Sequence, residues 1–300
     1  MNELFPGLIV GIGKNVAWIV LDGEDVPRVS AIKRSRGKRA MPVPGDRAEA
    51  QLLEDGTVII QRLLPRGATL QRHAARGRPK VMAANVDTLV TVTSLADPPP
   101  RLLTLDQLLA YTELEGTAAM VVLTKPDRAA PSTRLELASL YQTLRYPTLV
   151  VNPKTRQNID QLREALAGRH AMLAGVSGVG KSSIFRALGG DATVGAVSRA
   201  GLGKQTTSAA RLYRLPSGFL IDSPGVNEFG LGRLPADRVA GAFREIRDEA
   251  PGCRFSDCTH RSEPGCAVRL AVARGHIAES RYESYRQILQ MCYTAPRAEY

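Results

Sequence analysis

A glycine-rich segment behind an apolar run places the strongest constraint on the fold of this 300-residue chain. Residues 175–182 read GVSGVGKS and fit the pattern G-x-x-x-x-G-K-[ST] at every fixed position. Apolar residues 171–174 precede the loop and a helical pattern follows it. Because such a loop turns backbone N–H groups toward phosphates, it predicts a nucleoside triphosphate site in an α/β fold. The predicted contacts are Gly175, Val176, Ser177, Gly178, Val179, Gly180, Lys181, Ser182 and Ser183.

The end of this loop and segments downstream of it supply the expected catalytic and metal chemistry. Lys181 is expected to reach the β- and γ-phosphates, and the Ser182 hydroxyl to bind Mg²⁺. Asp222 ends an apolar run and is expected to hold Mg²⁺ through water, while the N–H group of Gly225 faces the γ-phosphate. A threonine in the Gly-rich stretch between Ser182 and Asp222 is expected to complete the metal shell and to order a switch segment. The predicted magnesium ligands are Ser182, Asp222 and one of Thr206 and Thr207.

A third segment, Thr124-Lys125-Pro126-Asp127, concerns the base of the nucleotide and follows the apolar run 118–123. A carboxylate at 127 can accept hydrogen bonds from N1–H and N2–H₂ of guanine, whereas adenine would leave it unpaired. The stem of Lys125 is expected to lie along the base. The segment therefore favours GTP and GDP as ligands, although alone it also fits an ordinary strand-to-helix turn.

The first 72 residues carry the pattern of a small β-barrel. Short apolar runs alternate with turn signals such as Asp22-Gly23 and Asp55-Gly56. Five such runs favour an oligonucleotide-binding (OB)-like barrel, by analogy at the level of the fold. The expected strands are 7–12, 16–21, 26–32, 47–53 and 57–64.

From about residue 80 the pattern changes. Apolar, β-branched runs alternate with helical stretches, which predicts right-handed βαβ units and a mainly parallel sheet in a domain at 73–234. Residues 235–300 are predicted to form a helical domain. The strands of the sheet are expected at 87–94, 118–123, 148–151, 171–174 and 219–222, and the helices at 102–114, 134–144, 159–167, 236–249, 266–274 and 280–292.

Three of the four cysteines lie close together in the C-terminal part. Cys253, Cys258 and Cys266, with His260, offer three thiolates and one imidazole. This set fills the tetrahedral shell of Zn²⁺ and leaves no open position, so it predicts one structural zinc ion. We expect chelation to unfold the C-terminal domain while the phosphate loop still binds nucleotide. The alternative is a group of unliganded cysteines in a reducing compartment.

Charge and hydropathy bound the partners. Forty Lys and Arg against 29 Asp and Glu give a net charge of +11, which favours an anionic partner such as nucleic acid. Two basic runs, at 33–39 and 72–80, together favour contact with RNA phosphates, although such runs also occur as solvated loops. No membrane-length apolar run or export signal is visible, so we expect a cytoplasmic protein with no membrane partner. We also expect a monomer. The predicted RNA contacts are Lys33, Arg34, Arg36, Lys38 and Arg39.

The nucleotide segments resemble the G-motifs of translation-factor-related GTPases, but T-K-x-D at 124 precedes the phosphate loop at 175 and D-x-P-G at 222. A circular permutation explains this order and preserves the site. With residues 83–87 (AANVD), 228–231 (EFGL) and the cysteine cluster, essentially the whole chain resembles the ribosome small-subunit-dependent GTPase A family. The resemblance implies a GTPase that binds the 30S subunit and its 16S rRNA late in assembly, is stimulated by the subunit and helps to mature the decoding region.

The chain departs from the family pattern at several positions. Thr124 replaces the Asn of N-K-x-D, which removes one side-chain amide contact. Asn152-Pro153 replaces the Ser-Ala of the guanine loop, and Gln205 replaces a common His before the switch threonines. Because the residue after D-x-P-G is the apolar Val226, we expect Gln205 to orient the attacking water, with slow intrinsic turnover that the ribosome stimulates.

Two other classes of function fit parts of the pattern. One is a nucleotide-regulated RNA-binding chaperone in which hydrolysis times release. The other is an ATP-dependent enzyme acting on a small substrate, which Asp127 and the lack of a second polar constellation disfavour. A guanine reader should shift toward xanthine nucleotides when Asp127→Asn is introduced.

Overall fold

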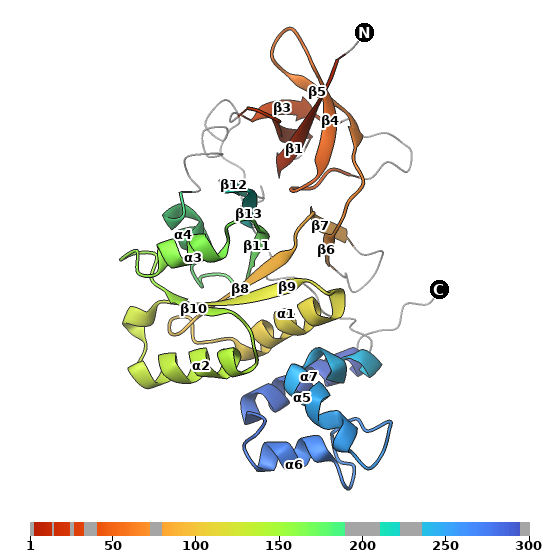
Figure 1. Ribbon diagram of the computed structural model, residues 1–300, viewed down its shortest axis with the longest axis vertical. Helices are drawn as coiled ribbons and strands as arrows, with labels where there is room; N and C mark the ends of the chain where they lie inside the picture. The colour runs from red at the N-terminus through yellow and green to blue at the C-terminus, as the bar shows by residue number, and fades with distance from the viewer. Residues whose placement is uncertain are drawn as a thin grey trace.

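Within residues 3–13, 15–24, 27–32, 41–72, 80–189, 211–222 and 236–294, which the computed structural model describes, the chain forms a barrel, a six-stranded sheet and a helical C-terminal part. Figure 1 shows the barrel at one end, the sheet with its helices in the middle and the C-terminal helices at the other end. None of the described helices combines the length and apolar character needed to cross a bilayer.

The barrel closes because its first strand pairs along both edges. Its strands are β1 (Leu4–Ile12), β2 (Val16–Leu21), β3 (Arg28–Ala31), β4 (Arg47–Leu52) and β5 (Val58–Leu63). Antiparallel pairing of β1 with β2 and β4, and parallel pairing of β3 with β5, gives the closed order β1-β2-β3-β5-β4. The predicted OB-like barrel is confirmed. Its interior is filled by Ile9, Ala17, Ile19, Leu21, Ala48, Ala50 and Val58.

A hairpin absent from the sequence prediction, β6 (Thr69–Arg72) with β7 (Lys80–Ala84), lies between the barrel and the sheet. The chain then turns at Asn85, which has a left-handed φ of 56°. The Asn85 side chain donates from Nδ2 to the carbonyl of Gly45 (2.7 Å) and accepts at Oδ1 from the N–H group of Gly67 (2.9 Å). Asn85 therefore fastens a barrel loop to the start of the sheet.

The described sheet is parallel except at one edge. In spatial order its strands are β10 (Thr148–Val151), β9 (Ala118–Thr124), β8 (Thr88–Ser94), β11 (His170–Ala174), β13 (Gly218–Asp222) and β12 (Arg211–Leu215). Only β12, which the sequence analysis missed, runs antiparallel to its neighbour. Every residue of β8 is buried, as expected for a parallel strand covered on both faces. The predicted mainly parallel sheet is confirmed.

Helices cover both faces of the sheet (Figure 1). They are α1 (Leu102–Glu115), α2 (Pro131–Thr143), α3 (Ile159–Ala165) and α4 (Lys181–Ala187). Successive residues of β9 face opposite sides, so Val121 packs with α1 and α2 while Val122 packs with α3 and α4. The carboxyl ends of the parallel strands meet at one edge, where ligands of open α/β sheets bind.

The C-terminal part contains α5 (Arg244–Glu249), α6 (Ala267–Ala273) and α7 (Glu279–Thr294). The predicted continuous helix at 236–249 is wrong, because two 3₁₀ turns precede α5 and Phe243 has extended backbone. Its ring is fully buried and meets the Tyr285 ring edge-on, 5.7 Å away. Phe243 and Tyr285 share one hydrophobic core with Leu108 and Tyr111 of α1. Packing against α1 therefore interrupts the helical period of this segment.

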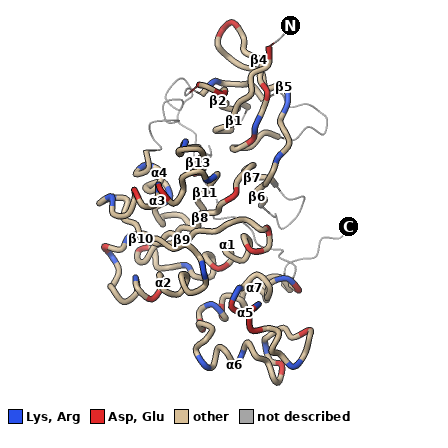
Figure 2. Tube along the Cα trace, viewed as in Figure 1, with Lys and Arg blue, Asp and Glu red and all other residues tan. Residues whose placement is uncertain are grey.

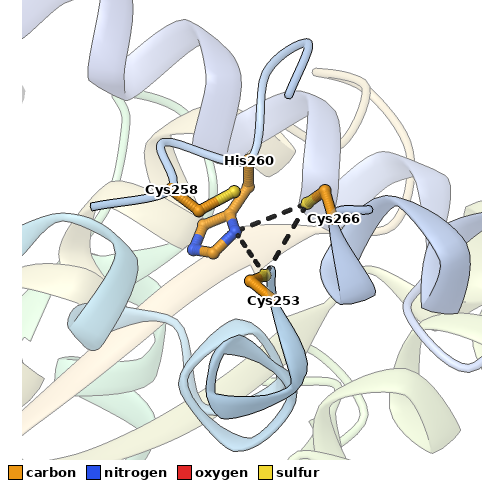
Figure 3. A group of neighbouring side chains, drawn as sticks. All are labelled: Cys253, Cys258, His260 and Cys266. Atoms are coloured by element: carbon orange, nitrogen blue, oxygen red, sulfur yellow. Dashed lines mark hydrogen bonds between the residues drawn. The ribbon is translucent and has the colours of Figure 1, made fainter. Parts of the chain in front are cut away.

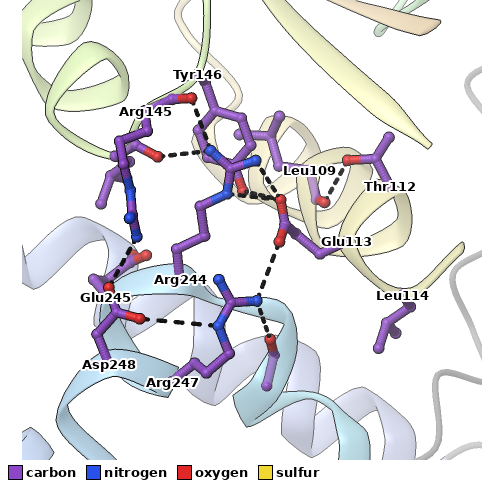
Figure 4. A network of polar contacts seen from close by, with 12 residues as sticks. Leu109, Thr112, Glu113, Leu114, Arg145, Tyr146, Arg244, Glu245, Arg247 and Asp248 are labelled. Carbon is purple, nitrogen blue, oxygen red and sulfur yellow. Dashed lines mark hydrogen bonds and ion pairs between the residues drawn. The ribbon is translucent and has the colours of Figure 1, made fainter. Parts of the chain in front are cut away.

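Ion pairs fasten α5 to the first helices (Figure 4). Arg244 donates to the Glu113 carboxylate of α1 at 2.7 Å. It also donates to the carbonyls of Leu144 (3.0 Å) and Arg145 (2.8 Å), which follow α2. Arg247 contributes a second bond to Glu113 at 3.3 Å. The C-terminal part thus holds the ends of both α1 and α2.

A fully buried ion pair also connects the C-terminal part to α1. The guanidinium of Arg281 in α7 donates to Asp106 of α1 (2.5 Å) and to Glu245 of α5 (2.6 Å). The side chains of Arg281 and Asp106 are each 1% exposed. The Tyr141 hydroxyl of α2 donates to the same carboxylate at 2.9 Å. Burial raises the pKa of Asp106, and the nearby Arg281 opposes that shift.

Candidate functional site

The loop between β11 and α4 depends on glycine at three positions. Gly175, Gly178 and Gly180 have φ values of 145°, 80° and 100°, which side chains with a Cβ rarely adopt. A Cβ on Gly175 would lie 2.1 Å from the carbonyl oxygen of Val92, so the approach of the loop to β8 also excludes larger residues. The sequence-predicted phosphate loop therefore has the backbone that its glycines were expected to permit.

Lys181 lies against this loop. Its ammonium donates to the carbonyls of Gly175 (2.7 Å) and Val176 (2.8 Å). Burial lowers the pKa of Lys181, and the carboxylate of Asp222 opposes that shift. A cation is thus held where the loop would receive an anion.

Two predicted magnesium ligands that are distant in sequence are neighbours in space. The Ser182 hydroxyl, at the start of α4, donates to Oδ2 of Asp222 at 3.1 Å. Asp222 ends β13 and is 8% exposed. A hydroxyl and a carboxylate are oxygen ligands of the kind that Mg²⁺ prefers, so this pair fits the ion. The other predicted members of the site, Gln205, Thr206, Thr207 and Gly225, lie outside the described residues.

The T-K-x-D segment is tied to the phosphate loop. The hydroxyl of Thr124, which is 1% exposed, donates to the carbonyl of Val179 at 2.6 Å. Lys125 has a left-handed φ of 56°, and its ammonium donates to the carbonyls of Gly178 (2.8 Å) and Asp97. Two consecutive side chains thus link the end of β9 to the loop after β11.

Asp127 lies one turn further on, in the short 3₁₀ helix η1 (Pro126–Arg128). Its exposed carboxylate accepts a hydrogen bond from the side-chain amide of Asn152, 2.9 Å away. Asn152 follows β10 and is 4% exposed. From the sequence, Asn152 was noted only as a departure from a family pattern, and Asp97 was not predicted as a site residue. These contacts join loops far apart in the chain, which local patterns do not reveal.

The three cysteines and the histidine of the predicted zinc site converge (Figure 3). One potential ligand atom from each of Cys253, Cys258, His260 and Cys266 lies within 4.8 Å of the others. Nδ1 of His260 is 3.4 Å from Sγ of Cys253 and 3.5 Å from Sγ of Cys266. Burial lowers the pKa of His260, which favours the neutral imidazole that binds metals. The donor set fits a metal ion with a preference for nitrogen and sulfur.

Glu263 organises the loop that carries these ligands. Its carboxylate accepts hydrogen bonds from the N–H groups of Thr259 (2.7 Å), Arg261 (2.8 Å) and Ser262 (3.0 Å). Although burial opposes the effect, hydrogen bonds from the Thr259 hydroxyl and from the backbone N–H groups of Glu263, Thr259 and Ser262 hold the pKa of Glu263 below its usual value. The Tyr282 hydroxyl of α7 also donates to the carbonyl of His260 at 2.6 Å. The loop is therefore held from within and by α7.

A cavity of about 690 Å³ lies away from both sites. Its walls come from the barrel and from the amino ends of β8, β11 and β13. They include Arg47, Asp87, His170, Arg214 and Phe219. The candidate nucleotide residues lie at the opposite ends of these strands.

A glycine-rich phosphate loop, a T-K-x-D segment tied to it and an aspartate at the end of β13 meet at the carboxyl edge of a parallel sheet. This arrangement defines a P-loop GTPase domain, and its T-K-x-D segment precedes its phosphate loop in the chain, as in a circular permutation. The chain belongs to the RsgA GTPase family, whose model matches residues 63–232. It is therefore a GTPase.

Relatives extend the similarity beyond that range. The chain is 39% identical over 261 residues to the small ribosomal subunit biogenesis GTPase RsgA of Dickeya dadantii, which covers 83% of this chain and 74% of the relative. It is 38% identical over 301 residues to the protein of the same name from Vibrio cholerae, and this match covers 95% of this chain and 76% of the relative.

Two solved structures share the fold. YjeQ from Thermotoga maritima matches with a TM-score of 0.75 and 27% identity over 98% of this chain and 100% of that one. YloQ, described as a circularly permuted GTPase, matches with a TM-score of 0.72 and 22% identity over 99% of this chain and 98% of that one. The second match concerns the fold alone, and it supports the permuted arrangement of the sheet.

Proposed function

We propose that this GTPase binds the 30S ribosomal subunit through its 16S rRNA and assists late assembly of the subunit, with turnover that the subunit stimulates. The observation that carries the hydrolytic part is the contact between Ser182 and Asp222 beside Lys181. The ribosomal part is inferred from relatives named small ribosomal subunit biogenesis GTPase. We further propose a cytoplasmic monomer.

The proposed chemistry is charge stabilisation at the γ-phosphate. Phosphoryl transfer has a loose transition state, so positioning and electrostatics supply most of the catalysis. Lys181 would neutralise the β- and γ-phosphates, and Ser182 and Asp222 would hold Mg²⁺, which neutralises developing charge when it is bound. Asp127 would read guanine, and Gln205 would orient the attacking water.

RNA binding is proposed for the basic run 33–39, which carries five Lys and Arg. The barrel arginines whose side chains are described each pair with a carboxylate, so little of their charge is available to a partner. Figure 2 shows Lys and Arg interspersed with Asp and Glu over the described chain. The run 33–39 contains no Asp or Glu, so it is the better candidate for phosphate contacts. The paired barrel arginines are Arg28, Arg47, Arg62 and Arg66.

We propose Zn²⁺ as the ion of the cysteine–histidine cluster. Three thiolates and one imidazole fill a tetrahedral shell and leave no position for a substrate, which makes the ion structural. Metal analysis of the purified protein should find one zinc ion per chain.

The deciding experiment compares GTP and ATP turnover with and without purified 30S subunits. We expect the protein to hydrolyse GTP and not ATP, and the subunit to accelerate GTP hydrolysis at least about tenfold. Replacing the five basic residues of 33–39 by Gln should weaken subunit binding and reduce its salt dependence. Arg62→Gln, which removes a paired barrel arginine, is the matched control. Subunit-independent turnover would contradict the ribosomal role and leave the GTPase intact.

A further inference from the structure

Asn152 contacts the carboxylate that is proposed to read the base. Its Nδ2 donates to Oδ1 of Asp127 at 2.9 Å. Asn152 is 4% exposed, whereas Asp127 is exposed. A buried amide therefore supports a carboxylate that faces solvent.

The orientation of the Asn152 amide is determined by a second contact. Its Oδ1 accepts a hydrogen bond from the backbone N–H group of Lys154 at 3.1 Å. A backbone N–H group can only donate, so the oxygen must face Lys154 and the NH₂ group must face Asp127. The backbone of Asn152 is held as well, since its N–H group donates to the carbonyl of Gln157 at 3.1 Å. Asn152 thus offers position 127 a donor in a fixed direction.

The neighbouring residue adds to the importance of this side chain. Pro153 has no N–H group, so the loop cannot donate to a base from that position. Within the described loop after β10, the Asn152 side chain donates the hydrogen bond to Asp127.

We propose that Asn152 is a positioning residue for base specificity, which fixes the plane of the Asp127 carboxylate and requires an acceptor at the atom facing it. This inference rests on the proposed reading of guanine by Asp127. A carboxylate satisfies the requirement and still presents acceptors to the N1–H and N2–H₂ groups of guanine. An amide at position 127 would have to turn its oxygen toward Asn152, which leaves it one orientation.

The test uses full-length protein and compares GTP with XTP binding in four forms: the wild type, Asn152→Ala, Asp127→Asn and the double variant. Asn152→Ala should weaken GTP binding about tenfold, the usual scale for a hydrogen bond to a charged group. Asp127→Asn should shift the preference toward XTP, because xanthine has an acceptor at C2. In the double variant the new amide is free to turn, so the XTP preference should fall at least about tenfold from that of Asp127→Asn.

The outcomes separate the two hypotheses. A double variant with the full XTP preference of Asp127→Asn would overturn the role of Asn152 while leaving guanine reading intact. No XTP shift in Asp127→Asn would overturn guanine reading, and this inference with it. Asn158→Gly is the matched control. It removes a side-chain amide of the same loop that donates to the carbonyl of Val150 and not to Asp127, and glycine tolerates the left-handed backbone at this position. If Asn152→Ala does not fold, Asn152→Ser replaces it, because serine keeps a small hydroxyl that can turn either as donor or as acceptor. If the double variant Asn152→Ser with Asp127→Asn had the same XTP preference as Asp127→Asn alone, the proposal would again be contradicted.

Discussion

The hydroxyl of Thr124 donates a hydrogen bond to the carbonyl oxygen of Val179, 2.6 Å away. Thr124 ends β9 and Val179 lies in the loop after β11, and both side chains are buried. The bond therefore joins the segment proposed to read the base to the segment proposed to bind the phosphates. A threonine makes this link at the position where the family pattern has an asparagine.

Thr124→Val should weaken GTP and GDP binding about fivefold, since it removes one buried hydrogen bond and preserves side-chain shape. Equilibrium binding of a fluorescent nucleotide measures the effect. Thr91→Val is the matched control, because it removes a buried hydroxyl that donates to the carbonyl of Met120 in the same sheet. Equal affinities for Thr124→Val and wild type would show that the link does not support the site.

Ser182→Ala should raise the Mg²⁺ concentration for half-maximal GTP hydrolysis about tenfold, because it removes one oxygen ligand beside Asp222. A Mg²⁺ titration of the steady-state rate measures this shift. An unchanged titration curve would argue that the Ser182 hydroxyl serves only Asp222.

Gln205→Ala should reduce the 30S-stimulated rate on the order of 10²-fold and leave GTP affinity nearly unchanged, since the residue is proposed to orient water. Single-turnover hydrolysis with saturating subunits separates the two effects. Retention of the full stimulated rate would assign water positioning to another group.

Metal removal should unfold residues 253–266 and α6, while the phosphate loop still binds nucleotide. Because Cys266 and Tyr285 share a core with Leu108 of α1, we expect faster amide exchange in α1 as well. Hydrogen exchange with and without a chelator tests this, with α3 on the opposite face as the internal control. Persistence of C-terminal helicity in the metal-free protein would exclude a structural role for the ion.

Arg281→Met should lower the free energy of unfolding by ~3–5 kcal/mol, because it leaves Asp106 and Glu245 buried without their cation. Urea denaturation measures the loss. Arg286→Met, which removes an exposed arginine paired with Glu283 in the same helix, should cost less than about 1 kcal/mol. Similar losses in the two variants would refute the importance of the buried pair.

Local pattern was enough to predict the barrel, the parallel strands and the phosphate loop. Runs such as those of β2 and β8 combine β-branched residues with clear turn signals, and glycine spacing identifies the loop. The edge strand β12 was missed because its short, Arg-containing sequence alternates without a strongly apolar face. The segment 236–249 was mistaken for one helix because periodicity does not register the burial of Phe243 against Tyr285.

The site was predictable only where a motif carries it. Lys181, Ser182 and Asp222 were predicted from spacing, and the structure brings Ser182 and Asp222 into contact. The partnership of Asn152 with Asp127 depends on how two loops meet after β9 and β10, so no spacing rule identifies it.

The order of strands in the chain has a consequence for synthesis. β10, β9 and β8 are complete once residue 151 has been made, but β8 receives its second neighbour only when β11 emerges. Until then the nascent half-sheet exposes a strand that is buried at every residue in the finished protein. Such an open edge invites pairing with other chains, so slow elongation between residues 151 and 174 would favour misassembly.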